Sequence, residues 1–363
     1  MRICASFLLS LLAVGLFVMA QSPDMNAIRT KVQNGEQLTP EEQSALQKMK
    51  AAQQAAQKKR REEYLKDHTP VSSTGNLALP DLGAGMYKGE QGGLYPGGSN
   101  TIPAAHLAAG LKIAKQIQPL DKDGHPSPGG KIVMLAIGFS NPNMEFPAFQ
   151  RMAAEEPDLN PKLMLVNGCV GGRSSEVIAN PDSNYWKEVK GLTDRAGTTF
   201  DQVQVIWFKL VVPNPTQPWP AETKLLATHY IATLQNFHKY FPNCKLAFAS
   251  NRTYGGYTEA NGSPEPWAYE SGFAVKWALA AQIEGKPELN YDPAKGEVRA
   301  PWAEWGPYLW TDGVKGRKDG FVYLRTDVGA DGLHPSASGQ KKVATLMMTF
   351  FKSDPATKGW FLK

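Results

Sequence analysis

The sequence predicts an α/β fold in which a parallel sheet carries helices on both faces. Two observations support this prediction. Short apolar runs without polar alternation, as in fully buried strands, alternate along the chain with longer segments of helical character. Strands and helices in this order favour a parallel sheet, because each return to the sheet needs a crossover connection. The apolar runs lie at 131–137, 162–166, 203–208 and 245–249.

Helices are expected between and after these runs. In two of them, 225–241 and 336–352, apolar residues recur three or four positions apart and form one face for burial. Residues 71–100 are rich in Gly and Pro and are expected to be irregular. Two further helices are expected, at 104–117 and 266–283.

The first 20 residues are typical of a secretory signal peptide. Arg2 precedes an apolar run that ends in the small residue Ala20, so cleavage is expected before Gln21. The alternative is an uncleaved anchor, for which the run is at the short end of the roughly 20 residues that a spanning helix needs. We therefore expect a secreted or periplasmic protein with no stable membrane insertion after cleavage.

Residues 21–70 form a polar segment ahead of the predicted domain at 71–363. Thr39, Pro40 and Glu42 match the cap, the first position and the capping box of a helix that should run to about residue 65. Its apolar stripe is thin, which favours an exposed spacer. The basic run 58–61 is either a solvated face or a docking site for a wall polymer.

Charge and metal-ligand spacing exclude several classes of function. The formal net charge is +5, and Arg2 leaves with the signal peptide. This excess is mild and its basic residues gather in the N-terminal segment, so nucleic acid is not an expected partner. The six histidines include no close pair at ligand spacing, and we expect neither a metal site nor another cofactor.

The two cysteines of the mature chain are expected to be free. Cys4 leaves with the signal peptide, Cys169 follows one predicted strand and Cys244 precedes another. In a parallel sheet these positions lie at opposite edges, and a strand of six residues is about 20 Å long. That separation is far beyond the reach of a disulfide.

Polar residues follow the predicted strands at the edge where open parallel sheets bind ligands. Ser140 follows the first strand, where it is either a nucleophile or a helix cap, and Asn141 and Pro142 after it exclude the usual nucleophile elbow. Gly171 and Gly172 follow the second strand, where they form either an oxyanion loop or a plain turn.

Asp331 and His334 stand directly ahead of the last predicted helix. At this spacing the carboxylate can hold the imidazole while the second ring nitrogen points outward to a serine, as a general base requires. The alternative is that His334 is a surface or capping residue.

Together, these segments resemble those of SGNH (GDSL-like) hydrolases. The sequence DGLHPSASGQKKVA at 331–344 is close to the fifth sequence block of that family. VGGRSS at 170–175 is similar to the second block of rhamnogalacturonan acetylesterase-like members. The first block departs from the family, with Gly-Phe-Ser-Asn at 138–141 where Gly-Asp-Ser is common. The resemblance covers residues 131–352.

This resemblance implies a three-layer α/β/α sandwich, SGNH/flavodoxin-like, with about five parallel strands. It also implies ester hydrolysis in which Ser140 attacks the acyl carbon, His334 transfers the proton and Asp331 orients the ring. The amides of Ser140 and Gly172 would hold the oxyanion, and no cofactor is required. With secretion, it favours an esterase that removes O-acyl groups, most plausibly acetyl, from a carbohydrate. The alternative is a glycan-binding protein of the same fold with little or no activity.

One expected donor is missing, and several residues are expected to face the substrate. The family carries an oxyanion asparagine after the third strand, where this chain offers Lys209 or Asn214. Arg252 follows the fourth strand, either to bind a carboxylate or sulfate or to pair with a nearby acid. The aromatic stretch 301–310 is expected to be a loop that stacks on sugars or packs in the interior. The expected substrate contacts are Asn141, Arg173, Lys209, Arg252 and Trp305.

Overall fold

The computed structural model describes residues 24–33, 36–64, 69–258 and 262–363. The predicted signal peptide lies outside these residues. The chain divides into two compact units, Met1–Arg60 and Arg61–Lys363, which are described separately.

The first unit contains helix α1 (Met25–Gln33) and most of helix α2 (Pro40–Tyr64). The predicted capping box of α2 is confirmed, since the Thr39 amide donates to Glu42 Oε2 at 2.9 Å and the Glu42 amide donates to Thr39 Oγ1 at 3.2 Å. Helix α1 was not predicted. Its Lys31 Nζ lies 2.7 Å from Glu42 Oε1, so an ion pair joins the two helices.

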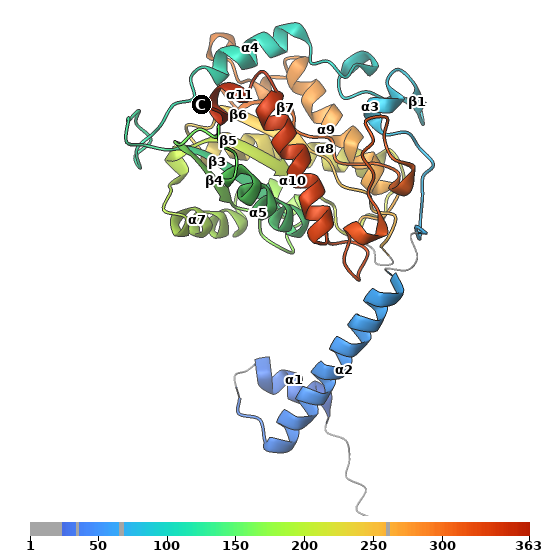
Figure 1. Cartoon of the computed structure of the whole chain (residues 1–363). Coiled ribbons are helices and arrows are strands. Elements are labelled where there is room, and N and C mark those ends of the chain that lie inside the picture. Colours follow the sequence, from blue (N-terminus) through green and yellow to red (C-terminus); the bar gives the residue numbers. More distant parts are fainter. Residues whose placement is uncertain (1–23, 34–35, 65–68, 259–261) are drawn as a thin grey trace, which may run out of the picture. The chain divides into compact units, whose positions relative to one another are not determined.

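The second unit is built on a parallel sheet of five strands, which confirms the predicted fold class (Figure 1). Four strands match the predicted apolar runs within one residue at each end. The fifth, β7, lies in the stretch that was expected to be a loop, and that prediction is wrong for these residues because they pair with β6. In spatial order the strands are β4 (Leu163–Asn167), β3 (Ile132–Gly138), β5 (Val203–Lys209), β6 (Leu246–Ser250) and β7 (Trp302–Trp305).

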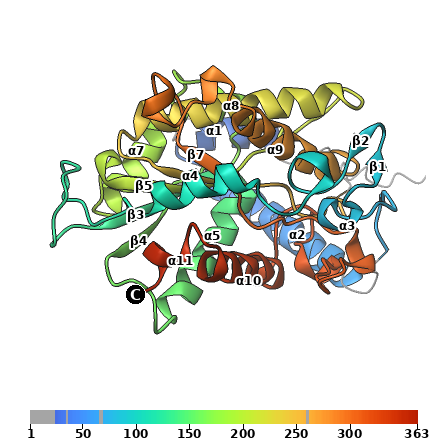
Figure 2. The same cartoon turned by 90° about the horizontal axis from the view of Figure 1, so that it is seen from above.

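Helices cover both faces of this sheet. Figure 2 shows α8 and α9 on one side and α5 and α10 on the other. Side chains of β3 alternate between the two layers: Leu135 packs in the core under α8 and α9, whereas Met134 packs under α5 and α10. The helices are α4 (Ala104–Ala114), α5 (Ser140–Ala154), α6 (Ser175–Ala179), α7 (Tyr185–Arg195), α8 (Ala221–Tyr240), α9 (Trp267–Ile283), α10 (Ala337–Ser353) and α11 (Lys358–Phe361).

The expected irregular stretch 71–100 contains four short elements, namely α3 (Leu79–Leu82), a small hairpin of β1 (Met86–Tyr87) and β2 (Glu90–Gln91), and a 3₁₀ helix at Pro96–Gly98. Cys169 and Cys244 are free, as predicted. None of the helices in the described ranges combines the length and hydrophobicity of a membrane-spanning segment.

Glu304 on β7 is a carboxyl group buried in the interior, where its side chain is hydrogen-bonded to Asp354. Burial and the neighbouring acid raise the pKa of Glu304 well above its usual value, and burial also raises that of Asp354. A carboxyl with a raised pKa in the folded state contributes stability at acidic pH, and this contribution is lost as the pH rises through the folded pKa.

We therefore expect Glu304→Gln, which stays neutral, to raise Tm at pH 8 and to reduce the fall in Tm between pH 5 and pH 8. Thermal unfolding across this range measures both effects. Glu288→Gln is the matched control, because Glu288 is exposed and its replacement should leave the pH dependence unchanged. An unaltered pH dependence in Glu304→Gln would contradict the prediction.

Candidate active site

Ser140 is the first residue of α5 and follows β3 after a single intervening residue. This tight passage requires Gly138, because a Cβ there would lie 2.6 Å from Pro142 Cγ and 2.7 Å from the carbonyl oxygen of Lys209. At the start of a helix the amides have no carbonyl partner within the helix, and the helix dipole is positive. The hydroxyl and amide of Ser140 therefore stand at the carboxyl edge of the sheet.

Ser140, His334 and Asp331 form one hydrogen-bonded chain. His334 Nε2 lies 2.9 Å from Ser140 Oγ, and His334 Nδ1 lies 2.6 Å from Asp331 Oδ2. Asp331 Oδ1 also accepts the amides of Leu333 and His334, each at 3.0 Å. The structure thus brings together a hydroxyl, an imidazole and a carboxylate from segments 194 residues apart.

Asp331 is charged at neutral pH. Burial opposes its ionisation, but hydrogen bonds from the His334 ring and from the amides of Leu333 and His334 lower its pKa to about 2. The Asp331 carboxylate can only accept, so His334 Nδ1 carries a proton and donates the hydrogen bond, which leaves Nε2 as an acceptor for the Ser140 hydroxyl. This arrangement suits a serine that gives its proton to a histidine.

The glycine loop after β4 is held beside Ser140 from two directions. The Ser175 amide donates to the carbonyl of Val211 at 2.7 Å, and Ser175 Oγ lies 2.9 Å from Nδ1 of His229 on α8. Gly172 has φ of +74°, a conformation that favours glycine, and no described residue accepts a hydrogen bond from its amide. His229 was missed, since nothing in its helical pattern marks it as a loop anchor.

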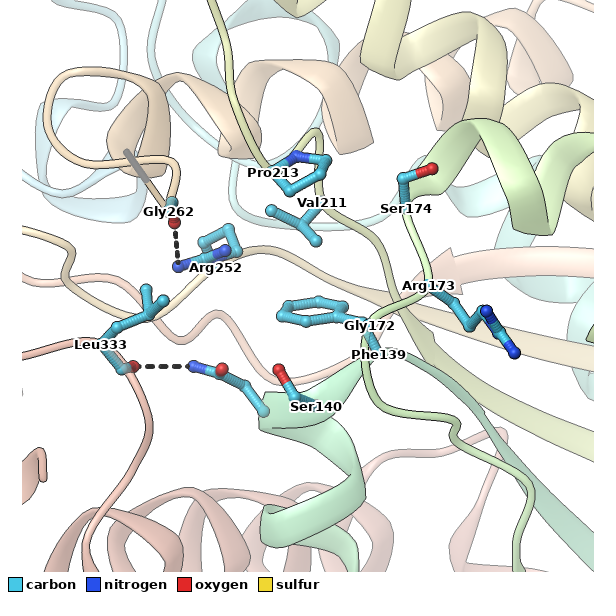
Figure 3. A pocket seen from close by; sticks show the side chains of 11 residues that line it. Phe139, Ser140, Gly172, Arg173, Ser174, Val211, Pro213, Arg252, Gly262 and Leu333 are labelled. Atoms are coloured by element: carbon cyan, nitrogen blue, oxygen red, sulfur yellow. Dashed lines mark hydrogen bonds between the residues drawn. The ribbon is translucent and has the colours of Figure 1, made fainter. Parts of the chain in front are cut away.

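A pocket of about 110 Å³ lies over Ser140 (Figure 3). Ser140, Asn141, Gly172, Arg173 and Arg252, all singled out from the sequence, are among the residues that line it. The rest of its lining is Phe139, Ser174, Val211, Pro213, Gly262 and Leu333.

Comparison with known proteins gives structural similarity only. No family model and no curated protein matches the chain. It is similar to a putative acylhydrolase from Bacteroides fragilis NCTC 9343, with 10% identity over 69% of this chain and 97% of that one and a TM-score of 0.37. It is also similar to an extracellular lipase from Streptomyces rimosus, with 11% identity over 60% of this chain and 99% of that one and a TM-score of 0.27.

A third similar structure is a salicylyl-acyltransferase from a tetracycline biosynthetic pathway, with 11% identity over 64% of this chain and 58% of that one and a TM-score of 0.31. Similarity at this level carries no argument about activity.

The prediction that Lys209 or Asn214 replaces the oxyanion asparagine is wrong. Lys209 Nζ lies 2.8 Å from both carboxylate oxygens of Glu145, and both side chains are 0% exposed. Lys209 therefore reaches neither an oxyanion nor a substrate. Asn214 is exposed and does not line the pocket, whose wall at this strand end is formed by Val211 and Pro213.

The prediction that Trp305 contacts the substrate is also wrong. Its side chain is buried in the core, and its indole Nε1 donates to the carbonyl of Leu94 at 2.6 Å. Trp302 and Trp310 are buried as well. The aromatic stretch packs in the interior, as one of the two interpretations proposed.

Arg173 and Asn141 line the pocket but have protein partners. Arg173 Nη2 lies 2.5 Å from Oε1 of Glu188 on α7, and Figure 3 shows the guanidinium turned away from Ser140. Asn141 Nδ2 donates to the carbonyl of Leu333 at 3.1 Å and so joins the serine turn to the loop that carries His334. Both were expected to bind the substrate, whereas these polar groups position the walls of the site.

Arg252 differs from these residues. It lines the pocket and forms no ion pair with any acid in the described part of the chain. Within the same ranges, no group of three or more His, Cys, Asp or Glu side chains is arranged to hold a metal ion.

Proposed function

We propose that this protein is a serine hydrolase that cleaves carboxylic esters. The observation that carries the proposal is the hydrogen-bonded chain from Ser140 Oγ through His334 to Asp331. Ser140 Oγ attacks the acyl carbon while His334 Nε2 accepts its proton, and the same proton then goes to the leaving alcohol as the ester C–O bond breaks. Water, activated by His334, releases the acid and regenerates Ser140.

The negative charge that develops on the carbonyl oxygen is stabilised by the amides of Ser140 and Gly172. Preorganised amide donors of this kind are usually a large part of catalysis in acyl transfer. Support comes from the position of Ser140 at the start of α5 and from the left-handed conformation that presents the Gly172 amide beside the same pocket.

The proposed substrate is a short O-acyl ester, with acetyl as the simplest acyl group and a carbohydrate as the alcohol. The small pocket supports a short group beside Ser140. The sugar is supported by the resemblance of 170–175 to the second block of acetylesterase-like members, whereas the buried aromatic stretch lends it none. Export, as the first 20 residues predict, would bring the protein to such polymers.

Fluorophosphonate labelling tests the proposal directly. We expect the probe to label the wild-type protein and to leave the Ser140→Ala variant unlabelled. 4-Nitrophenyl acetate should be hydrolysed by untreated wild type, and neither by the Ser140→Ala variant nor by wild type after labelling. Ser353→Ala is the control, because Ser353 is an exposed residue on α10. Labelling that persists in Ser140→Ala would show that another residue is the nucleophile.

A second candidate is a glycan-binding protein with little or no activity. It is favoured by the wall of Val211 and Pro213, which offers no side-chain donor to an oxyanion where the resemblance leads one to expect an asparagine. Losing one such donor costs about 10²- to 10³-fold in kcat. Labelling of Ser140 without turnover of any short ester, together with binding of a glycan, would favour this candidate.

We expect Gly172→Ala to lower kcat about 10- to 100-fold. A Cβ at Gly172 meets no atom within 4 Å, so the effect would come from the strain of φ near +74°, which turns the amide away from the oxyanion. Gly197→Ala is a matched control, with φ of +72°, equally open surroundings and no place in the pocket. Steady-state kinetics with 4-nitrophenyl acetate decide, and equal losses in both variants would contradict the proposed role.

A further inference from the structure

We propose that Arg252 binds a negatively charged group of the substrate, so that the ester carries a carboxylate within a few bonds of its reacting carbonyl. This inference rests on the proposed function and names the substrate class more closely. It starts from a cation that lines the same pocket as Ser140 (Figure 3) and pairs with no acid in the described part of the chain.

Arg252 is placed by the fold at the reactive edge of the sheet. It follows β6 by two residues, and its amide donates to Ser271 Oγ at 3.0 Å, which fixes the backbone there. The side chain is only 2% exposed, although it lines the pocket. Its guanidinium carbon lies 5.3 Å from the centre of the Phe139 ring, which orients the group without neutralising its charge.

Arg252 forms few hydrogen bonds for a buried guanidinium. Its Nη2 donates to the carbonyl of Gly262 at 3.3 Å, and its buried Nε has no hydrogen-bond partner among the described residues. No described carboxylate lies within ion-pair distance of it.

Among the described residues, two acids act on Arg252 through their charge, and both already have hydrogen-bond donors. Both oxygens of Glu145 accept from Lys209 Nζ. Glu265 Oε1 accepts from the Gly255 amide at 2.9 Å and from Trp310 Nε1 at 2.8 Å, and its Oε2 accepts from the amide of Tyr269 at 3.1 Å.

A buried cation without a counterion is costly to the folded protein. Burial lowers the pKa of Arg252 to about 10, which still leaves the guanidinium charged at neutral pH. Buried charges in proteins are nearly always compensated by an opposite charge or by hydrogen bonds. Among the described residues no acid pairs with Arg252, so we infer that compensation arrives from the pocket.

The shape of the site favours a carboxylate close to the reacting carbon. A guanidinium can donate two parallel hydrogen bonds to the two oxygens of a carboxylate. The pocket is small, about 110 Å³, and apolar side chains of Phe139, Val211, Pro213 and Leu333 form much of its wall. A group that reaches Arg252 from Ser140 must therefore be short, as in the half-ester of a short dicarboxylic acid.

The experiment compares charged esters with neutral esters of the same shape. Monomethyl succinate carries a carboxylate on the acyl side where methyl levulinate carries a neutral acetyl group. Acetoxyacetate carries a carboxylate on the alcohol side where acetoxyacetamide carries a neutral amide. Release of methanol or acetate, followed by NMR, gives kcat/KM for each. We expect wild type to prefer monomethyl succinate over methyl levulinate at least about 10-fold, as a charge-assisted hydrogen bond implies.

Variants test whether Arg252 causes this preference. Arg252→Gln should bring the ratio of charged to neutral ester to about 1, and Arg252→Lys should leave an intermediate ratio. Arg299→Gln is the control, because Arg299 forms an exposed ion pair with Glu297 and should retain the wild-type ratio. A wild-type ratio near 1 for both pairs, or a ratio that survives in Arg252→Gln, would overturn the inference. A preference seen only for acetoxyacetate would place the carboxylate of the substrate on the alcohol side. It would overturn the proposal that the substrate is the half-ester of a dicarboxylic acid.

Binding separates failure of this inference from failure of the proposed function. If no ester of either charge is hydrolysed, the proposed function fails, and calorimetry on the full-length wild-type chain then compares succinate with succinamide. At least about 10-fold tighter binding of succinate supports the anion site and needs no variant that might not fold. Equal binding of the two, or no binding of succinate, overturns it.

Discussion

We expect Ser140→Ala and His334→Ala each to lower kcat for ester hydrolysis by at least about 10⁴-fold, with little change in KM. The serine variant lacks the attacking oxygen, and the histidine variant lacks the base 2.9 Å from that oxygen. The pocket that binds the substrate is otherwise retained, so the loss falls on the chemical step.

The same experiment includes the double variant. Because Ser140 and His334 act as one unit, the kcat of the double variant should lie within a few-fold of that of the less active single variant. Ser353→Ala and His125→Ala are the controls, since both residues are exposed and neither lines the pocket. A double variant whose loss equals the product of the two single losses would contradict a shared mechanism.

The second large effect concerns stability and the buried ion pair of Glu145 and Lys209. Glu145→Ala should lower the free energy of unfolding by about 3–5 kcal/mol, because it leaves an ammonium group without its carboxylate at a position that is 0% exposed. Lys209→Met should be costly for the same reason. The double variant Glu145→Leu/Lys209→Met should be less destabilised than either single variant, since it removes both charges.

Urea unfolding of wild type, the two single variants and the double variant measures the four free energies of unfolding. The exposed pair of Lys190 and Asp194, 2.9 Å apart, is the control, and Lys190→Met should change the free energy of unfolding by less than about 1 kcal/mol. Additive losses at Glu145 and Lys209 would show that the two charges do not depend on each other.

Much of the fold follows from local patterns in the chain. Apolar runs without alternation predicted β3 to β6 correctly, because a strand buried on both faces needs no polar positions. Strand β7 was missed because its Trp, Gly and Pro content is typical of a loop, and its extended form depends on pairing with β6.

Lys209 ends β5 at the edge of the sheet that carries Ser140, yet its side chain is buried against Glu145. Side chains alternate along a strand, so Lys209 shares a face with Val205 and Trp207 and points toward the layer of α5. Its position at the strand end was interpreted as access to the site. The alternation was visible in the sequence, but the partner, Glu145, becomes apparent only when α5 is packed on that face.

The sequence was enough to name the hydroxyl, imidazole and carboxylate, because motif spacing and the strand-end rule depend on short stretches of chain. The partners of the charged residues were decided only by the tertiary structure. Arg173 meets Glu188, Lys209 meets Glu145, and Arg252 meets no acid among the described residues. Whether a charged side chain is paired within the protein or left for a ligand depends on which distant segments pack against each other. Short stretches of sequence do not contain that information.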